Sequence, residues 1–84
     1  MGPYAVYVHL DLLESVPGKG EQRRQIMSFI RSLAENPHFV GDYTDRDESL
    51  RIRQIKIISR YAITYWADDP AKSVVIVGVR HADR

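Results

Sequence analysis

The side chains best suited to chemistry are cations in the last third of the chain. Arg51 and Arg53 lie two residues apart in a β-prone stretch, and Arg80 is followed at once by His81. Residues two apart in a strand point to the same face, so we expect Arg51 and Arg53 to share one face of a sheet. Arginine binds phosphate through paired hydrogen bonds and stabilises a phosphoryl transition state, while histidine transfers protons near neutral pH. Such a set could cleave RNA without a metal ion by assisting attack of the 2′-hydroxyl group.

Two nearby residues could extend this set into a nucleic-acid surface, and a plainer interpretation stays open throughout. Lys56 adds a cation to the same stretch, and Tyr61 begins an aromatic segment whose rings could stack on bases. Cations on a strand can also simply solvate an exposed face, and aromatic residues in a short central strand more often form core. His81 could equally belong to a tail.

Several other kinds of site are disfavoured. The chain has no cysteine, which excludes disulfides, a cysteine zinc site and a thiol nucleophile. The histidines His9, His38 and His81 do not fall at the spacing of metal ligands. No serine lies in a nucleophile-elbow motif, and residues 18–20 lack the spacing of a phosphate-binding loop. We therefore expect no metal ion and no cofactor.

The elements that must position the cations are mostly strands. We expect three strands between residues 50 and 83, separated by a tight turn at residues 59–60 and a hairpin loop at residues 68–72. Consecutive strands with such short links form an antiparallel meander. Alternation predicts one further strand over residues 4–10. We expect residues 38–48 to form a surface loop with a short strand near Tyr43.

One helix is predicted clearly, over residues 21–35, and it ends before Pro37. Its apolar residues recur at helical spacing, at Ile26, Phe29, Ile30, Leu33 and Ala34. Asp11 is expected to cap a short helical turn. The fold class is therefore α+β, with a small antiparallel sheet (the N-terminal strand plus the C-terminal meander) packed against one long helix and a short helical turn. We expect a single domain over residues 1–84.

The charge is distributed unevenly along the chain. Residues 1–48 hold five Lys or Arg against eight Asp or Glu, whereas residues 49–84 hold seven against three, within a net charge of +1. The basic half is the sheet half, which favours a nucleic-acid or acidic partner over a membrane. A domain this small buries roughly 60% of its unfolded surface, so a partner would add stability. With no signal peptide and no long apolar span, we expect a cytoplasmic protein.

Four segments together resemble the RelE/ParE toxin superfamily of bacterial type II toxin–antitoxin systems. They are the Tyr-x-Val strand at residues 4–8, the helix end at residues 33–37, the strand at residues 60–68 and the hydrophobic-Gly-x-Arg end at residues 77–81. The resemblance implies a small antiparallel sheet wrapped by one or two N-terminal helices. RelE-type members are ribosome-dependent mRNA endonucleases, ParE-type members inhibit DNA gyrase, and both are held inactive by a cognate antitoxin.

The resemblance also implies roles for individual residues. Arg80 matches the last-strand arginine of RelE-type enzymes, and His81 lies near a proton-transfer position. Ala62 stands where the family has an arginine, and Arg60 is expected to take its place because alternation puts it on the same face. RelE's C-terminal tyrosine has no counterpart in the sequence. The expected nucleic-acid-binding residues are Arg51, Arg53, Lys56 and Tyr61.

Three functions stay open on this basis. The first is a toxin that acts as a metal-independent mRNA interferase, an endoribonuclease that binds ribosome and mRNA and inhibits translation. The second is a ParE-like inhibitor of DNA gyrase, and the third is a catalytically degenerate protein that binds only an antitoxin. In each of them the partner implied by the resemblance is a cognate antitoxin protein.

Overall fold

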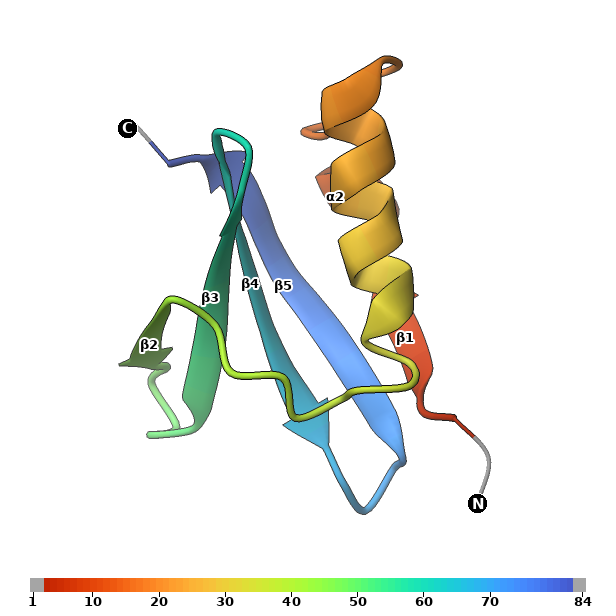
Figure 1. Cartoon of the computed structure of the whole chain (residues 1–84). Coiled ribbons are helices and arrows are strands. Elements are labelled where there is room, and N and C mark those ends of the chain that lie inside the picture. Colours follow the sequence, from red (N-terminus) through yellow and green to blue (C-terminus); the bar gives the residue numbers. More distant parts are fainter. Residues whose placement is uncertain (1–2, 83–84) are drawn as a thin grey trace.

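Five strands form one mixed sheet in the order β1-β5-β4-β3-β2 (Figure 1). The computed structural model describes residues 3–82. The strands are β1 (Ala5–Val8), β2 (Tyr43–Arg46), β3 (Ile52–Ile58), β4 (Tyr61–Asp68) and β5 (Ser73–His81). The predicted meander of β3, β4 and β5 is confirmed, with antiparallel pairing throughout. The predicted short strand near Tyr43 is β2, which forms one edge of the sheet beside β3.

The predicted α+β class is confirmed, but one strand pair differs from the antiparallel sheet that we expected. β1 pairs in parallel with β5, from Ala5 opposite Ser73 to Val8 opposite Ile76. The start of β1 is held beside the β4–β5 turn, because the Tyr4 hydroxyl donates a 2.8 Å hydrogen bond to Asp69. Both strands therefore begin at the same end of the sheet and run in the same direction.

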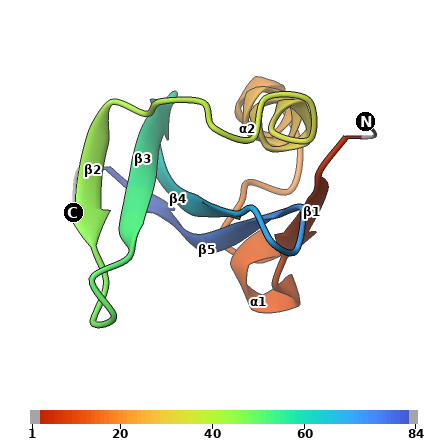
Figure 2. The same ribbon diagram turned by 90° about the horizontal axis from the view of Figure 1, so that it is seen from below.

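The predicted long helix is α2 (Glu21–Ser32), which lies on one face of the sheet (Figure 2). It ends three residues earlier than residue 35, and Leu33 is its C-cap. Ile26, Ile30 and Leu33 of its predicted apolar stripe are buried, and Phe29 is partly buried against the same core. The fully buried side chains of the core are Ile26, Leu33, Ile63, Tyr65 and Val74.

The short helical turn is α1 (Leu10–Leu13), and its cap differs from our prediction. The helix begins one residue before Asp11, and the His9 ring nitrogen accepts a 3.2 Å hydrogen bond from the Asp11 backbone N–H. In Figure 2 α1 lies below β1, on the side away from α2. Neither helix within residues 3–82 is long and apolar enough to cross a membrane.

The segment that leads from α2 to β2 is held in place where Gly41 lies close to the backbone of β3. Gly41 donates its backbone N–H to the Gln54 side-chain oxygen at 2.9 Å. A Cβ atom at residue 41 would lie only 2.5 Å from the Ile55 carbonyl oxygen. Only glycine fits there without displacing β3. The approach sets where β2, and the acidic residues it carries, lie against β3.

Candidate functional site

The side chains of Arg53, Thr64 and Arg80 lie on the sheet face away from α2. Ile63 and Tyr65 of β4 are buried under α2, so Thr64 between them points to the other face. Arg53 and Arg80 lie beside it, and with Asp45 and residues 77–78 they line a hollow of about 190 Å³. We call this the Arg53–Arg80 hollow. The strand register brings together two arginines that are far apart in the sequence.

Arg80 also borders a second hollow, at the end of β5. Ser15, Tyr61, Val79 and His81 line it together with Arg80. We call it the His81 hollow. Within residues 3–82, Arg80 makes no ion pair and its side chain is exposed. Among the described residues its guanidinium thus has no carboxylate partner, and it lies at the boundary between the two hollows.

Arg80 and His81 are adjacent in sequence but are positioned differently. Arg80 lies opposite Ala62, and His81 lies opposite Tyr61 on the face that α2 covers. The ring centroids of His81 and Tyr61 are 4.5 Å apart. Both Arg80 and His81 border the His81 hollow, Arg80 from the face away from α2 and His81 from the face that α2 covers.

The structure places Tyr61 in the core rather than on a base-binding surface. Only 9% of Tyr61 is exposed, because it alternates with Ile63 and Tyr65 on the covered face. Its ring supports the His81 imidazole instead.

Arg60 lies in the tight turn between β3 and β4, before the first residue of β4, and its side chain is exposed. The turn begins at Ser59, which has a φ of 59°.

Arg53 is held by a carboxylate across the strand pair. It lies directly opposite Asp45 of β2, and its Nε and Nη2 atoms donate 2.8 Å hydrogen bonds to the two Asp45 carboxylate oxygens. This paired geometry is the strongest kind of arginine–carboxylate contact. Hydrogen bonding to Asp45 raises the pKa of the Arg53 guanidinium above its ordinary value.

Arg51 lies immediately before β3 rather than within it. Its guanidinium carbon lies 3.9 Å from the centroid of a Trp66 ring, and Nη1 lies 3.3 Å from an Asp47 oxygen. Trp66 follows Tyr65, so it lies on the face away from α2, where Arg53 also lies. The prediction that Arg51 and Arg53 share a face is therefore confirmed. The backbone N–H of Arg51 also donates to Asp47, which lowers the pKa of that carboxyl group.

Lys56 does not belong to this face. It pairs with Ile63 in the register, so it lies on the side of the sheet that faces α2. Its Nζ lies 3.4 Å from an Asp42 oxygen and 5.8 Å from the centroid of the Phe39 ring. Lys56 is therefore separated from Arg53 by the sheet, because residues three apart in a strand point to opposite faces.

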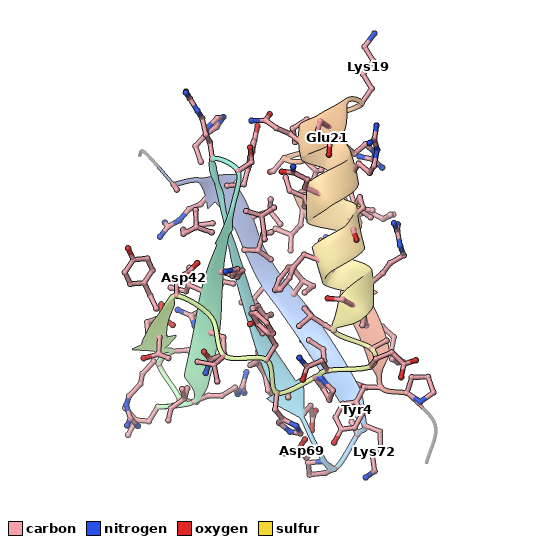
Figure 3. The ribbon with its side chains drawn as sticks, viewed as in Figure 1. Tyr4, Lys19, Glu21, Asp42, Asp69 and Lys72 are labelled. Carbon is pink, nitrogen blue, oxygen red and sulfur yellow. The ribbon has the colours of Figure 1, made fainter. Side chains whose placement is uncertain are left out.

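The acidic partners of these cations were not predicted from the sequence. The β3 cations Arg53 and Lys56, and Arg51 just before them, each pair with one aspartate from residues 42–47. Figure 3 shows Asp42 at the start of this segment, beside β2. The acidic composition of residues 42–48, next to a basic strand, was the available signal, but only the β2–β3 register identifies the pairs. Within residues 3–82 no group of three or more His, Asp or Glu side chains could hold a metal ion.

Comparison with known proteins identifies the fold. No family model and no curated protein matches the sequence. Among solved structures, the chain is similar to a chain in the crystal structure of the toxin–antitoxin complex RelBE2 from Mycobacterium tuberculosis, with 24% sequence identity and a TM-score of 0.58. The match covers 94% of this chain and 98% of that chain. The protein therefore has the RelE-like fold that its sequence motifs implied.

Proposed function

We propose that the protein is the toxin of a type II toxin–antitoxin system and a ribosome-dependent mRNA endonuclease that inhibits translation in the cytoplasm. The observation that carries the proposal is the position of Arg80, which borders both hollows and makes no ion pair within residues 3–82. A free guanidinium at the end of a strand binds a phosphate group through two hydrogen bonds. The fold shared with a chain of a toxin–antitoxin complex supports both the toxin role and an antitoxin partner.

The chemistry needs only groups that border the two hollows. The mRNA 2′-oxygen attacks the adjacent phosphorus and loses its proton to water, while the bond from phosphorus to the 5′-oxygen breaks. The products are a 2′,3′-cyclic phosphate and a 5′-hydroxyl end. Arg80 stabilises the charge on the phosphoryl oxygens, and Arg53 supplies a second cation on the same face. His81 in its protonated form donates a proton to the leaving 5′-oxygen.

A second function is favoured by one specific observation. The cations at residues 51, 53 and 56 are each paired with an aspartate, and Ala62 provides no cation beside Arg80. A surface neutralised in this way suits binding to a protein target better than binding to a polyanion. The alternative is therefore a toxin that inhibits DNA gyrase, or a catalytically inactive protein that binds only its antitoxin.

Induced expression in a bacterial host separates these functions. Growth arrest with an immediate block of protein synthesis is the result expected of the endonuclease. Filamentation with DNA damage would support gyrase inhibition, and unimpaired growth would support a protein that only binds an antitoxin. The Arg80→Ala variant should restore protein synthesis, whereas Arg31→Ala, which removes an exposed arginine of α2, should leave the arrest unchanged.

A further inference from the structure

We propose that Asp45 acts as an internal substitute for phosphate that keeps Arg53 masked in the free protein. The inference rests on the proposed function, because it concerns how the same face binds an RNA backbone. A phosphate group and a carboxylate use the same two donors of a guanidinium group. Asp45 already occupies Nε and Nη2 of Arg53, each at 2.8 Å. In the free protein Arg80 is therefore the cation ready to bind an anion in the Arg53–Arg80 hollow.

The Asp45 carboxylate lies where a competing anion can displace it from Arg53. It belongs to β2, an edge strand of four residues that pairs with β3. The side chains of Arg53 and Asp45 are 26% and 39% exposed, so solvent and ligands reach the pair. Because both side chains reach solvent, this ion pair is screened and contributes less than a buried pair of the same geometry would. A phosphate group already held by Arg80 in the same hollow can therefore compete with the Asp45 carboxylate for Arg53.

The neighbouring aspartates do not share this role. Asp47 accepts hydrogen bonds from the backbone N–H groups of Ser49 and Arg51, so it holds the β2–β3 turn. Asp42 accepts one from the backbone N–H of Ile57 at 2.8 Å. Within residues 3–82, Asp45 is the one of these three aspartates whose carboxylate accepts no backbone hydrogen bond, and of the three it alone lines the Arg53–Arg80 hollow. A substitution of Asp45 should therefore change charge at the hollow without breaking the turn.

The consequence is a weak affinity for RNA in the free protein. While Asp45 masks Arg53, one cation in the hollow is available to a polyanion. The affinity of the protein for free RNA, away from the ribosome, is therefore low. When a phosphate group displaces Asp45, both arginines contact the RNA backbone. The carboxylate then faces solvent at the edge of the sheet.

The test is binding of a single-stranded RNA oligonucleotide by the wild-type chain and the Asp45→Asn variant, followed by fluorescence anisotropy over a range of salt concentrations. We expect the variant to bind about two- to fivefold more tightly, the scale of one exposed ion pair. Its salt dependence should be steeper by about 0.7 in log–log slope, the effect of one additional phosphate contact on a single strand. Glu35→Gln, which removes the same charge from an exposed residue beyond α2, should change neither quantity to this extent.

Two further variants make the cause specific. In the wild-type background Arg53→Ala should change RNA affinity little, because Arg53 is masked, whereas in the Asp45→Asn background it should remove the gain. Equal or weaker binding by Asp45→Asn, or a gain that survives Arg53→Ala, would overturn the inference. A large loss of RNA affinity in the Arg53→Ala single variant would also overturn the inference. This measurement does not depend on whether Asp45→Asn folds. Asp45-dependent RNA binding without ribosomal cleavage would count against the endonuclease, not against masking.

Discussion

Arg80 of β5 lies directly opposite Ala62 of β4, the position at which the resemblance to RelE/ParE toxins implies an arginine. The Ala62 side chain is 7% exposed and provides no charge. The cations on this side of the sheet therefore come from β5 and from the start of β3, not from β4. Arg53, one strand further away, is the residue that lines a hollow together with Arg80.

Tyr65→Phe should lower the free energy of unfolding by about 1 kcal/mol, because it removes one buried hydrogen bond. Tyr65 is fully buried, and its hydroxyl donates a 2.8 Å hydrogen bond to the carbonyl oxygen of Phe39. Chemical denaturation measures the change. Tyr43→Phe, at a residue that is 63% exposed, is the matched control and should be neutral. Equal stability of the two variants would show that the bond to Phe39 contributes nothing net.

Alkaline pH should destabilise the fold through the same residue. Burial raises the pKa of Tyr65 to about 12, so it stays protonated in the folded chain at pH values where the unfolded chain ionises. Stability from this group is fully present below about pH 10 and is lost as the pH rises toward about 12. Denaturant midpoints between pH 8 and pH 12 should fall in the wild type. The fall should be smaller in Tyr65→Phe, and an identical pH dependence in the two proteins would contradict this.

Gly41→Ala should destabilise the protein by about 1–3 kcal/mol, the usual cost of forcing extra atoms into a packed position. The new Cβ would lie 2.5 Å from the Ile55 carbonyl oxygen, so β2 and its loop would have to shift. Gly78→Ala is the matched control, since its Cβ would meet Thr64 at an ordinary 3.6 Å. Thermal melts of both variants give the comparison. A melting temperature for Gly41→Ala that equals the control would mean that the loop accommodates the methyl group freely.

Asp69→Asn should weaken the fold above about pH 4 and flatten its response to acid. Asp69 accepts hydrogen bonds from Tyr4 and from His38, at 2.8 and 2.7 Å, and these lower its pKa, the Tyr4 bond most strongly. Figure 3 shows Tyr4, Asp69 and Lys72 gathered near the β4–β5 turn. A carboxyl group whose pKa is lower in the folded chain than in the unfolded chain stabilises the protein at pH values above its unfolded-state pKa. This stability is lost as the pH falls through its folded-state pKa. Melting temperatures between pH 2.5 and pH 6 should therefore vary less in Asp69→Asn than in the wild type.

Much of the fold could be predicted because its elements carry local patterns. The helical spacing of Ile26, Ile30 and Leu33 predicted α2 and its buried face, and the turn at residues 59–60 predicted the β3–β4 hairpin. The direction of β1 could not be predicted in the same way. Its neighbour is about 68 residues away in the sequence, and a hydrophobic pattern states which face is buried but not which way a partner strand runs.

The candidate site could be predicted only in part for a related reason. Alternation places Arg53 on one face and Lys56 on the other, and the structure shows both positions. The pairing of Asp45 with Arg53 depends on the register of β2, a strand of four residues with little local signal. The cations could therefore be identified from the sequence, whereas the aspartates that neutralise them become evident only in the structure.

The most direct test of the account is mRNA cleavage on programmed ribosomes by the wild-type chain, Arg80→Ala and Arg31→Ala. Arg31→Ala removes the same charge from an exposed position on α2, so it controls for a general loss of affinity for RNA. We expect cuts at the A-site codon by the wild type and Arg31→Ala, and loss of these cuts in Arg80→Ala. No cleavage by a well-folded wild-type chain, or equal cleavage by Arg80→Ala, would contradict the proposed function.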